Sequence, residues 1–153
     1  MTNDLTVRHL DGDRFAIEIR GHTITVDQPL DAGGTDTAPT PTELFIAGLA
    51  SCVSFYARRY LARHDLSAEG LTVTADYEIG GRPTRVARIS VLITPPRDLP
   101  ADRRDAFLAV ASHCTVHNTL TQTPSINIEL TDLTRAGVDP TRIVGTGTTP
   151  VTV

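Results

Sequence analysis

The sequence predicts an α+β fold in which antiparallel strands and two helices follow one another in the order βββ-α-ββ-α-β. Three observations carry this prediction: short alternating segments near the N-terminus, one long apolar segment with a clear helix start, and two longer alternating segments joined by a Gly- and Pro-containing turn. With 153 residues, the chain is long enough for a single domain that buries roughly two thirds of its unfolded surface.

The N-terminal part predicts a meander of short antiparallel strands. Residues 5–10, 14–19 and 23–26 each alternate between apolar and polar side chains, and turn-forming residues separate them. Residues 27–41 are rich in Gly, Pro, Asp and Thr, which indicates a loop. This loop is long for a compact domain, and loops of that length are often functional.

A long helix is predicted to begin at Thr40. A threonine N-cap, Pro41 in the first helical position and Glu43 three residues after the cap together form a capping box. The helix should continue to about His64, and residues 44–57 are apolar on nearly all sides. A helix of this kind is buried in the protein or in an oligomer interface, and we therefore expect a dimer that covers it.

The second half of the chain predicts a hairpin, a helix and a final strand. Residues 70–80 and 84–96 carry the strongest strand patterns, with a turn between them, and residues 98–114 show helical spacing. Ser125–Leu130 alternates again and predicts a last strand. We expect residues 1–132 to form the single domain and residues 133–153 a C-terminal tail that is extended or disordered.

Composition excludes several classes of function. The net charge of −4 argues against a nucleic-acid partner, because phosphate binding needs a basic surface. All basic residues are arginine, which excludes lysine-based chemistry such as a Schiff base. The N-terminus lacks the pattern of a signal peptide, and no apolar run approaches the ~20 residues of a membrane span. We therefore expect a soluble, cytoplasmic protein that does not engage a membrane.

The two cysteines, Cys52 and Cys114, are far apart in the sequence, and a static disulfide between them is not expected in a cytosolic chain. Cys52 lies within the apolar helix, where a cysteine is by default a small buried residue. Apolar surroundings make a thiol less acidic, and the helix N-terminus is about three turns away. Chemistry at Cys52 would need a cation supplied from elsewhere in the molecule.

Cys114 stands in the segment "HCTVH", with His117 three residues later. This spacing is half of a zinc pattern, but the rest of such a pattern is missing, and we expect neither a metal nor a cofactor. A Cys–His hydrolase dyad is a second possibility. The third is a redox pair in which Cys52 attacks and Cys114 resolves.

The segments "APTPTELFIAGLASC" and "HCTVH", separated by a hairpin and a helix, resemble the OsmC/Ohr family of osmotically inducible and organic hydroperoxide resistance proteins. The resemblance covers roughly residues 5–130. It implies an intertwined homodimer with antiparallel sheets around a central buried helix and an active site at the dimer interface. It also implies that Cys52 is the peroxidatic cysteine and Cys114 the resolving one.

The activity that the resemblance implies is thiol-dependent reduction of organic hydroperoxides, an antioxidant role in the stress response. The reductant would be a dithiol, such as a lipoylated protein. Phe45, Leu49 and Phe55 would surround Cys52 and favour bulky organic peroxides, and His117 would lie beside them. In the family, an arginine from the N-terminal strands activates the thiolate, and the candidates here are Arg14 and Arg20.

The sequence departs from the family pattern at two positions. The hydroperoxide-resistance branch has a glutamate one residue before Glu43, and this chain has Thr42 there. Glu43 remains a candidate for the catalytic acid, although the capping box already accounts for it. The family segment C-P-V-H is C-T-V-H here, with Thr115 in place of proline.

Two other functions remain open at the level of sequence. The chain could be a binding protein of the same fold that holds a small apolar or thiol ligand without turnover, and Thr42 favours that alternative. It could also be a Cys–His hydrolase or acyl-transferase that uses Cys52 or Cys114 with His117. The hydrolase would form a thioester and would not depend on a second thiol.

Overall fold

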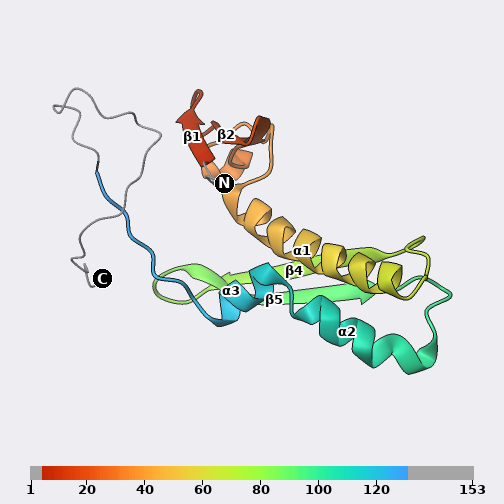
Figure 1. Ribbon diagram of the computed structural model, residues 1–153. Helices are drawn as coiled ribbons and strands as arrows, with labels where there is room; N and C mark the ends of the chain where they lie inside the picture. The colour runs from red at the N-terminus through yellow and green to blue at the C-terminus, as the bar shows by residue number, and fades with distance from the viewer. Residues whose placement is uncertain (1–4, 131–153) are drawn as a thin grey trace, which may run out of the picture.

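The computed structural model describes residues 5–130 and shows an α+β fold with two separate antiparallel sheets (Figure 1). The first sheet has three strands in chain order: β1 (Leu5–His9), β2 (Phe15–Ile19) and β3 (His22–Val26). Each strand pairs with the next without a shift in register. The predicted N-terminal meander is therefore confirmed.

The long helix α1 spans Pro41–Arg63 and begins as the sequence predicts. The amide of Glu43 donates to the Thr40 hydroxyl at 3.1 Å, and the amide of Thr40 donates to the Glu43 carboxylate at 2.7 Å. Both halves of the capping box are thus present. They give partners to two amides that would otherwise lack one at the helix start.

The second sheet is a hairpin of β4 (Thr72–Gly80) and β5 (Arg85–Thr94), which the sequence also predicts. A shift in register between Glu78 and Ile79 interrupts the pairing. Helix α1 packs against this hairpin and against α2 (Arg104–Ser112), which follows a short 3₁₀ turn (Figure 1).

The hydrophobic core lies where α1, α2 and the hairpin meet. Every third or fourth residue of α1 enters it, as expected for one face of a helix. Its fully packed members are Leu49, Val53, Ala57, Tyr60, Leu61, Leu99, Phe107, Ala111 and Cys114.

The predicted second helix ends two residues earlier than expected, and a helix that we did not predict follows it. Helix α2 stops at Ser112, and Cys114 is extended, with φ −71° and ψ 156°. The chain then turns into α3 (Thr115–Thr121), for which Cys114 is the N-cap. Because a short helix has almost no periodicity of its own, the sequence pattern assigned no element to residues 115–121.

The strand predicted at Ser125–Leu130 does not form within the single chain. The segment has no regular structure, and the side chains of Ile126, Ile128 and Leu130 are 81%, 90% and 101% exposed. A strand needs a hydrogen-bonding partner beside it, and this segment pairs with none of the described strands, although β1, β3, β4 and β5 each have a free edge. The tail predicted for residues 133–153 lies outside the described residues.

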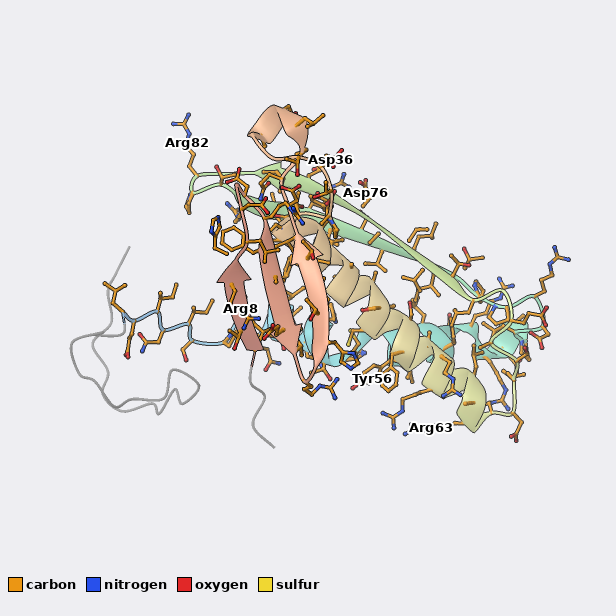
Figure 2. All side chains as sticks on the ribbon, turned by 90° about the horizontal axis from the view of Figure 1, so that it is seen from above. Arg8, Asp36, Tyr56, Arg63, Asp76 and Arg82 are labelled. Carbon is orange, nitrogen blue, oxygen red and sulfur yellow. The ribbon has the colours of Figure 1, made fainter. Side chains whose placement is uncertain are left out.

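Within the single chain, helix α1 is buried on one face only, so the rest of its expected burial depends on the predicted dimer. Phe45 and Phe55 are 41% and 53% exposed, on the face of α1 away from the core. The three-stranded sheet lies near the N-terminal end of α1 and covers little of the helix (Figure 2). In that view Arg8 marks the sheet, and Tyr56 and Arg63 mark α1. Among the described residues, no helix is long and apolar enough to cross a membrane.

Candidate active site

The fold brings Cys52 and Cys114 together from two different elements. Cys52 lies in the middle of α1, and Cys114 lies at the junction between α2 and α3. Cys52 packs against the core cluster that includes Cys114 and lies near enough to raise the pKa of Cys114, and both thiols are free. Cys52 is half-buried, whereas Cys114 is completely buried. Two thiols that are distant in sequence therefore share one site, and only Cys52 is open to solvent.

The environment of Cys114 favours its neutral thiol. Burial raises the pKa of Cys114 above its ordinary value, because a thiolate loses its hydration there. The neighbouring Cys52 raises this pKa further. The backbone amide of His117 donates to the Cys114 sulfur at 3.4 Å and opposes the shift without cancelling it. At neutral pH Cys114 is a protonated thiol, which is a poor first nucleophile.

A pocket of about 420 Å³ lies between α1, β5, α2 and α3, and neither Cys52 nor Cys114 is among the residues that line it. Leu49 and His117, two of the predicted pocket residues, line it. Phe45 and Phe55 do not, because they project from the outer face of α1. The other lining residues are mostly aliphatic: Val53, Val86, Ala87, Arg88, Ile89, Val91, Ile93, Leu108, Ser112 and Leu120.

His117 is held by its position in the first turn of α3. Its ring atom Nδ1 is buried and has no hydrogen-bond partner among residues 5–130. Its recorded contact with a cysteine is made through the backbone amide and not through the ring. No three His, Cys, Asp or Glu side chains in the described part of the chain gather where they could hold a metal ion.

The two candidate activating arginines lie on the three-stranded sheet. Arg14 forms an ion pair with Asp11 at 3.2 Å, and its Nε atom is buried without a partner in the described structure. Arg20 is exposed in the turn between β2 and β3, in a left-handed conformation with φ 49°. Neither side chain makes a recorded contact with Cys52 or Cys114 within the described residues of one chain.

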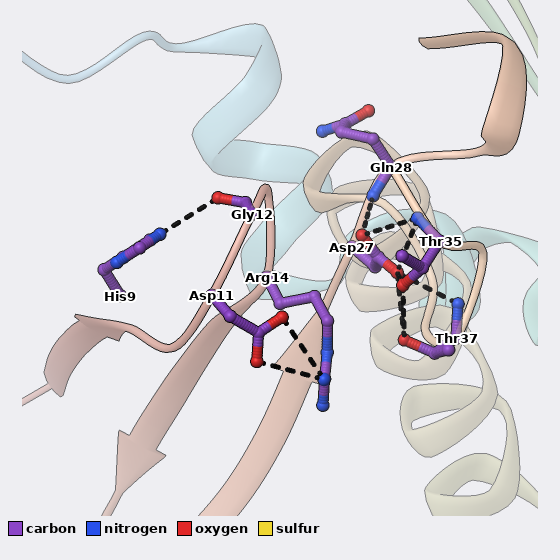
Figure 3. Close-up of polar contacts among 8 residues, drawn as sticks. All are labelled: His9, Asp11, Gly12, Arg14, Asp27, Gln28, Thr35 and Thr37. Atoms are coloured by element: carbon purple, nitrogen blue, oxygen red, sulfur yellow. Dashed lines mark hydrogen bonds and ion pairs between the residues drawn. The ribbon is translucent and has the colours of Figure 1, made fainter. Parts of the chain in front are cut away.

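The loop between β3 and α1 is organised by Asp27, a residue that sequence reasoning missed. Its carboxylate is 1% exposed and accepts hydrogen bonds from the amides of Gln28, Thr35 and Thr37 and from both threonine hydroxyls (Figure 3). These donors hold the pKa of Asp27 far below its usual range, with the Thr35 hydroxyl contributing most. The available signal was an aspartate followed by a Thr- and Gly-rich stretch, which is typical of side-chain-stabilised turns.

This loop is tightly packed around Asp27. A side chain at Gly34 would meet the Gln28 carbonyl oxygen at 1.9 Å, so that position accepts only glycine. The amide of Asp27 also donates to the Pro39 carbonyl at 3.2 Å, which ties the end of β3 to the start of α1. The long loop noted in the sequence is therefore a structured connection.

Comparison with known proteins supports the resemblance seen in the sequence. A family model described as OsmC-like protein matches residues 34–129. A search of curated proteins gave no match.

Several solved structures have the same fold. A protein from Psychrobacter arcticus 273-4, described as an osmotic stress induced and detoxification response protein, is 24% identical, with a TM-score of 0.71 over 78% of this chain and 88% of that one. The organic hydroperoxide resistance protein OsmC of Legionella pneumophila is 20% identical, with a TM-score of 0.58 over 78% and 90%.

A Vibrio cholerae protein, described as an organic hydroperoxide resistance protein and holding captopril in one of its active sites, is 20% identical, with a TM-score of 0.59 over 80% and 88%. At these identities the three similarities establish the fold alone.

Proposed function

Because the chain belongs to the OsmC-like family, we propose that it is a thiol-dependent peroxidase that reduces organic hydroperoxides through Cys52 and Cys114. The observation that carries the proposal is that both cysteines of the chain meet in one site, although they come from different elements. One of them is accessible and the other is buried and protonated, which suits an attacking and a resolving thiol.

In the first step, the Cys52 thiolate attacks the terminal oxygen of the hydroperoxide. An S–O bond forms, the O–O bond breaks, and the released alkoxide takes up a proton and leaves as an alcohol. The sulfur is oxidised by two electrons to a sulfenic acid, and the peroxide is reduced by the same two electrons.

In the second step, Cys114 condenses with the sulfenic acid. An S–S bond forms and the S–O bond breaks, and water leaves with the proton of the Cys114 thiol. An external dithiol, such as a lipoylated protein, then reduces the disulfide by thiol–disulfide exchange and is itself oxidised to a disulfide. The pairing protects Cys52 from further oxidation.

We further propose that the active unit is a homodimer. The outer face of α1 and the Ile126–Leu130 segment leave large apolar side chains in water, which a second copy would cover. Arg14 and Arg20 make no recorded contact with the cysteines of their own chain, so the cation that activates Cys52 would come from the partner's N-terminal sheet. In that dimer Phe45 and Phe55 would border the substrate, and an apolar site favours organic peroxides.

Intact mass and thiol titration before and after one equivalent of cumene hydroperoxide test the mechanism. We expect both thiols to disappear with a loss of two hydrogen atoms in mass, and Cys52→Ser to abolish the reaction. Cys114→Ser should stop at the sulfenic acid and gain further oxygen with excess peroxide. If both thiols of the wild-type protein stay unreacted, the peroxidase proposal fails.

A binding function is the second candidate, because the mostly apolar pocket between α1, β5, α2 and α3 could hold a small ligand. The same experiment with excess dithiol separates the two functions, since a binding protein consumes no peroxide. A hydrolase would retain full activity in Cys114→Ser if Cys52 were its nucleophile, and it would accumulate a thioester with acyl substrates.

A further inference from the structure

A hydrogen bond joins the two cysteine-bearing segments beside the thiols. The hydroxyl of Tyr56 lies 3.0 Å from the hydroxyl of Thr115. Tyr56 is one helical turn after Cys52 on α1, and Thr115 directly follows Cys114. This contact links the α2–α3 junction to α1 at the level of the cysteine pair.

Tyr56 is held in place by its neighbours on α1. The Arg59 guanidinium lies over the Tyr56 ring at 6.0 Å from its centre, and Phe55 packs against the ring edge at 5.7 Å between centres. The ring also packs against the edge of the core, and its hydroxyl meets the Thr115 hydroxyl at the surface, at the start of α3.

Thr115 lies where it can affect the position of the Cys114 side chain. It is the first residue of α3, a helix of seven residues whose N-cap is Cys114 itself. So short a helix has little stability of its own and depends on its tertiary contacts. A contact made by its first residue will therefore affect how firmly the preceding cysteine is seated.

We propose that Tyr56 and Thr115 are positioning residues that form a latch, and that the latch holds Cys114 against Cys52 for disulfide formation. The inference rests on the proposed function, because it concerns the second step of that cycle. In that step the Cys114 sulfur bonds to the Cys52 sulfur, the hydroxyl of the sulfenic acid departs, and the Cys114 proton completes the water molecule. The latch takes no part in the bond changes and acts only on the approach of Cys114.

The latch predicts how much of the Cys52 sulfenic acid becomes the disulfide and how much becomes a sulfinic acid. With the latch closed, the buried Cys114 thiol is the nearest reactant and the disulfide forms first. With the latch open, α3 can separate from α1, and the sulfenic acid survives long enough to react with a second peroxide. The product is then a sulfinic acid, which the dithiol cannot reduce.

The variants Tyr56→Phe and Thr115→Val each remove one hydroxyl and keep the size of the side chain. Thr115→Ser retains the hydroxyl and should restore the behaviour of the wild type. Two matched controls make the same changes elsewhere: Tyr60→Phe, whose hydroxyl reaches the Arg103 carbonyl, and Thr119→Val, one turn further along α3. Thermal unfolding of all five variants establishes that they are folded.

The first measurement needs no peroxide. The Cys52–Cys114 disulfide is equilibrated with oxidised and reduced glutathione, and the ratio of disulfide to dithiol is read by mass. Loss of one hydrogen bond should reduce the equilibrium constant by up to about fivefold in Tyr56→Phe and Thr115→Val. The serine variant and both controls should remain at the wild-type value, and the double variant Tyr56→Phe/Thr115→Val should be no worse than either single one.

The second measurement is the ratio of sulfinic acid to disulfide after excess cumene hydroperoxide, which should rise in the same two variants. If they match the wild type in the glutathione equilibrium, or if the controls shift as far as they do, the latch is refuted. If the glutathione equilibrium shifts as expected but peroxide leaves the wild-type thiols intact, the positioning role of Tyr56 and Thr115 is supported and the peroxidase proposal is refuted.

Discussion

At the scale of single residues, the two thiols differ in what surrounds them. Cys114 is completely buried at the N-cap of α3, whereas Cys52 is reached by solvent. The raised pKa of Cys114 follows first from burial, which penalises the thiolate, and then from the proximity of Cys52. The pair is therefore asymmetric before any partner or substrate arrives.

This asymmetry can be measured in the Cys52→Ser variant, which leaves Cys114 as the sole cysteine. We expect iodoacetamide to alkylate Cys114 slowly at neutral pH, with a pH midpoint above the ordinary thiol value of about 8.5. The Cys114→Ser variant provides the comparison, since Cys52 should react faster at every pH below that midpoint. Equal rates in the two variants would contradict the assignment of Cys114 as the protected thiol.

Asp27 gives a second prediction at this scale, with a defined dependence on pH. Its pKa is depressed in the folded protein, so its charged form contributes stability above the unfolded-state pKa of about 4, and this contribution is lost progressively as the pH falls below that value. Asp27→Asn should therefore lower the urea midpoint at pH 7, and the difference from the wild type should shrink towards pH 3. Asp36→Asn in the same loop, which is exposed, is the control. A difference that is independent of pH would contradict this account.

At the scale of elements, α1 is the support of the whole site. Its start is fixed by hydrogen bonds between Thr40 and Glu43, and one face supplies both the core contacts and Cys52. Glu43 is thus occupied with the helix start, about two and a half turns before Cys52. The capping box is sufficient to explain the position of Glu43, and its role as a catalytic acid stays a prediction.

The capping box predicts the effects of two substitutions. Thr40→Ala should reduce the free energy of unfolding by about 1 kcal/mol, because the amide of Glu43 loses its acceptor. Glu43→Gln keeps a side chain that can complete the box and should leave peroxide consumption unchanged. Urea unfolding and a peroxide assay with excess dithiol measure the two quantities. A large loss of turnover in Glu43→Gln, with normal stability, would instead make Glu43 a catalytic acid.

At the scale of the whole molecule, the single chain leaves apolar surface that a monomer rarely exposes. The segment from Ile126 to Leu130 alternates as a strand does but pairs with no strand edge among the described residues, and its three apolar side chains are almost fully exposed. The proposed homodimer would supply that edge and would bring an arginine of the partner subunit towards Cys52.

Sedimentation equilibrium tests this directly, with twice the mass of the chain as the expected result. Ile128→Lys should weaken the dimer by about tenfold or more, because burial of an isoleucine contributes about 1.5–3 kcal/mol. Asn127→Lys is the matched control, since neighbouring side chains of an extended segment point to opposite faces. A wild-type protein that remains monomeric at micromolar concentration would refute the homodimer, and with it the arginine from the partner.

Sequence patterns were enough to predict the elements whose hydrogen bonds are local. These elements join residues that are close along the chain, so the local sequence pattern was sufficient to predict them. They are the capping box at Thr40, the meander of β1 to β3 and the hairpin of β4 and β5. The two cysteines and the resemblance of their flanking segments also came from the sequence, because they depend only on residue type and order.

Features that depend on contacts between distant residues became visible only in the folded chain. Two such features are the end of α2 before Cys114 and the short helix α3, which both depend on packing against α1. A segment of seven residues has too little helix propensity to be predicted as a helix from its sequence. The exclusion of Phe45 and Phe55 from the cavity depends on which face of α1 meets the hairpin. The Tyr56–Thr115 contact joins residues that no sequence pattern connects. A hydroxyl can bond to many donors and acceptors, so its partner is known only from the folded structure.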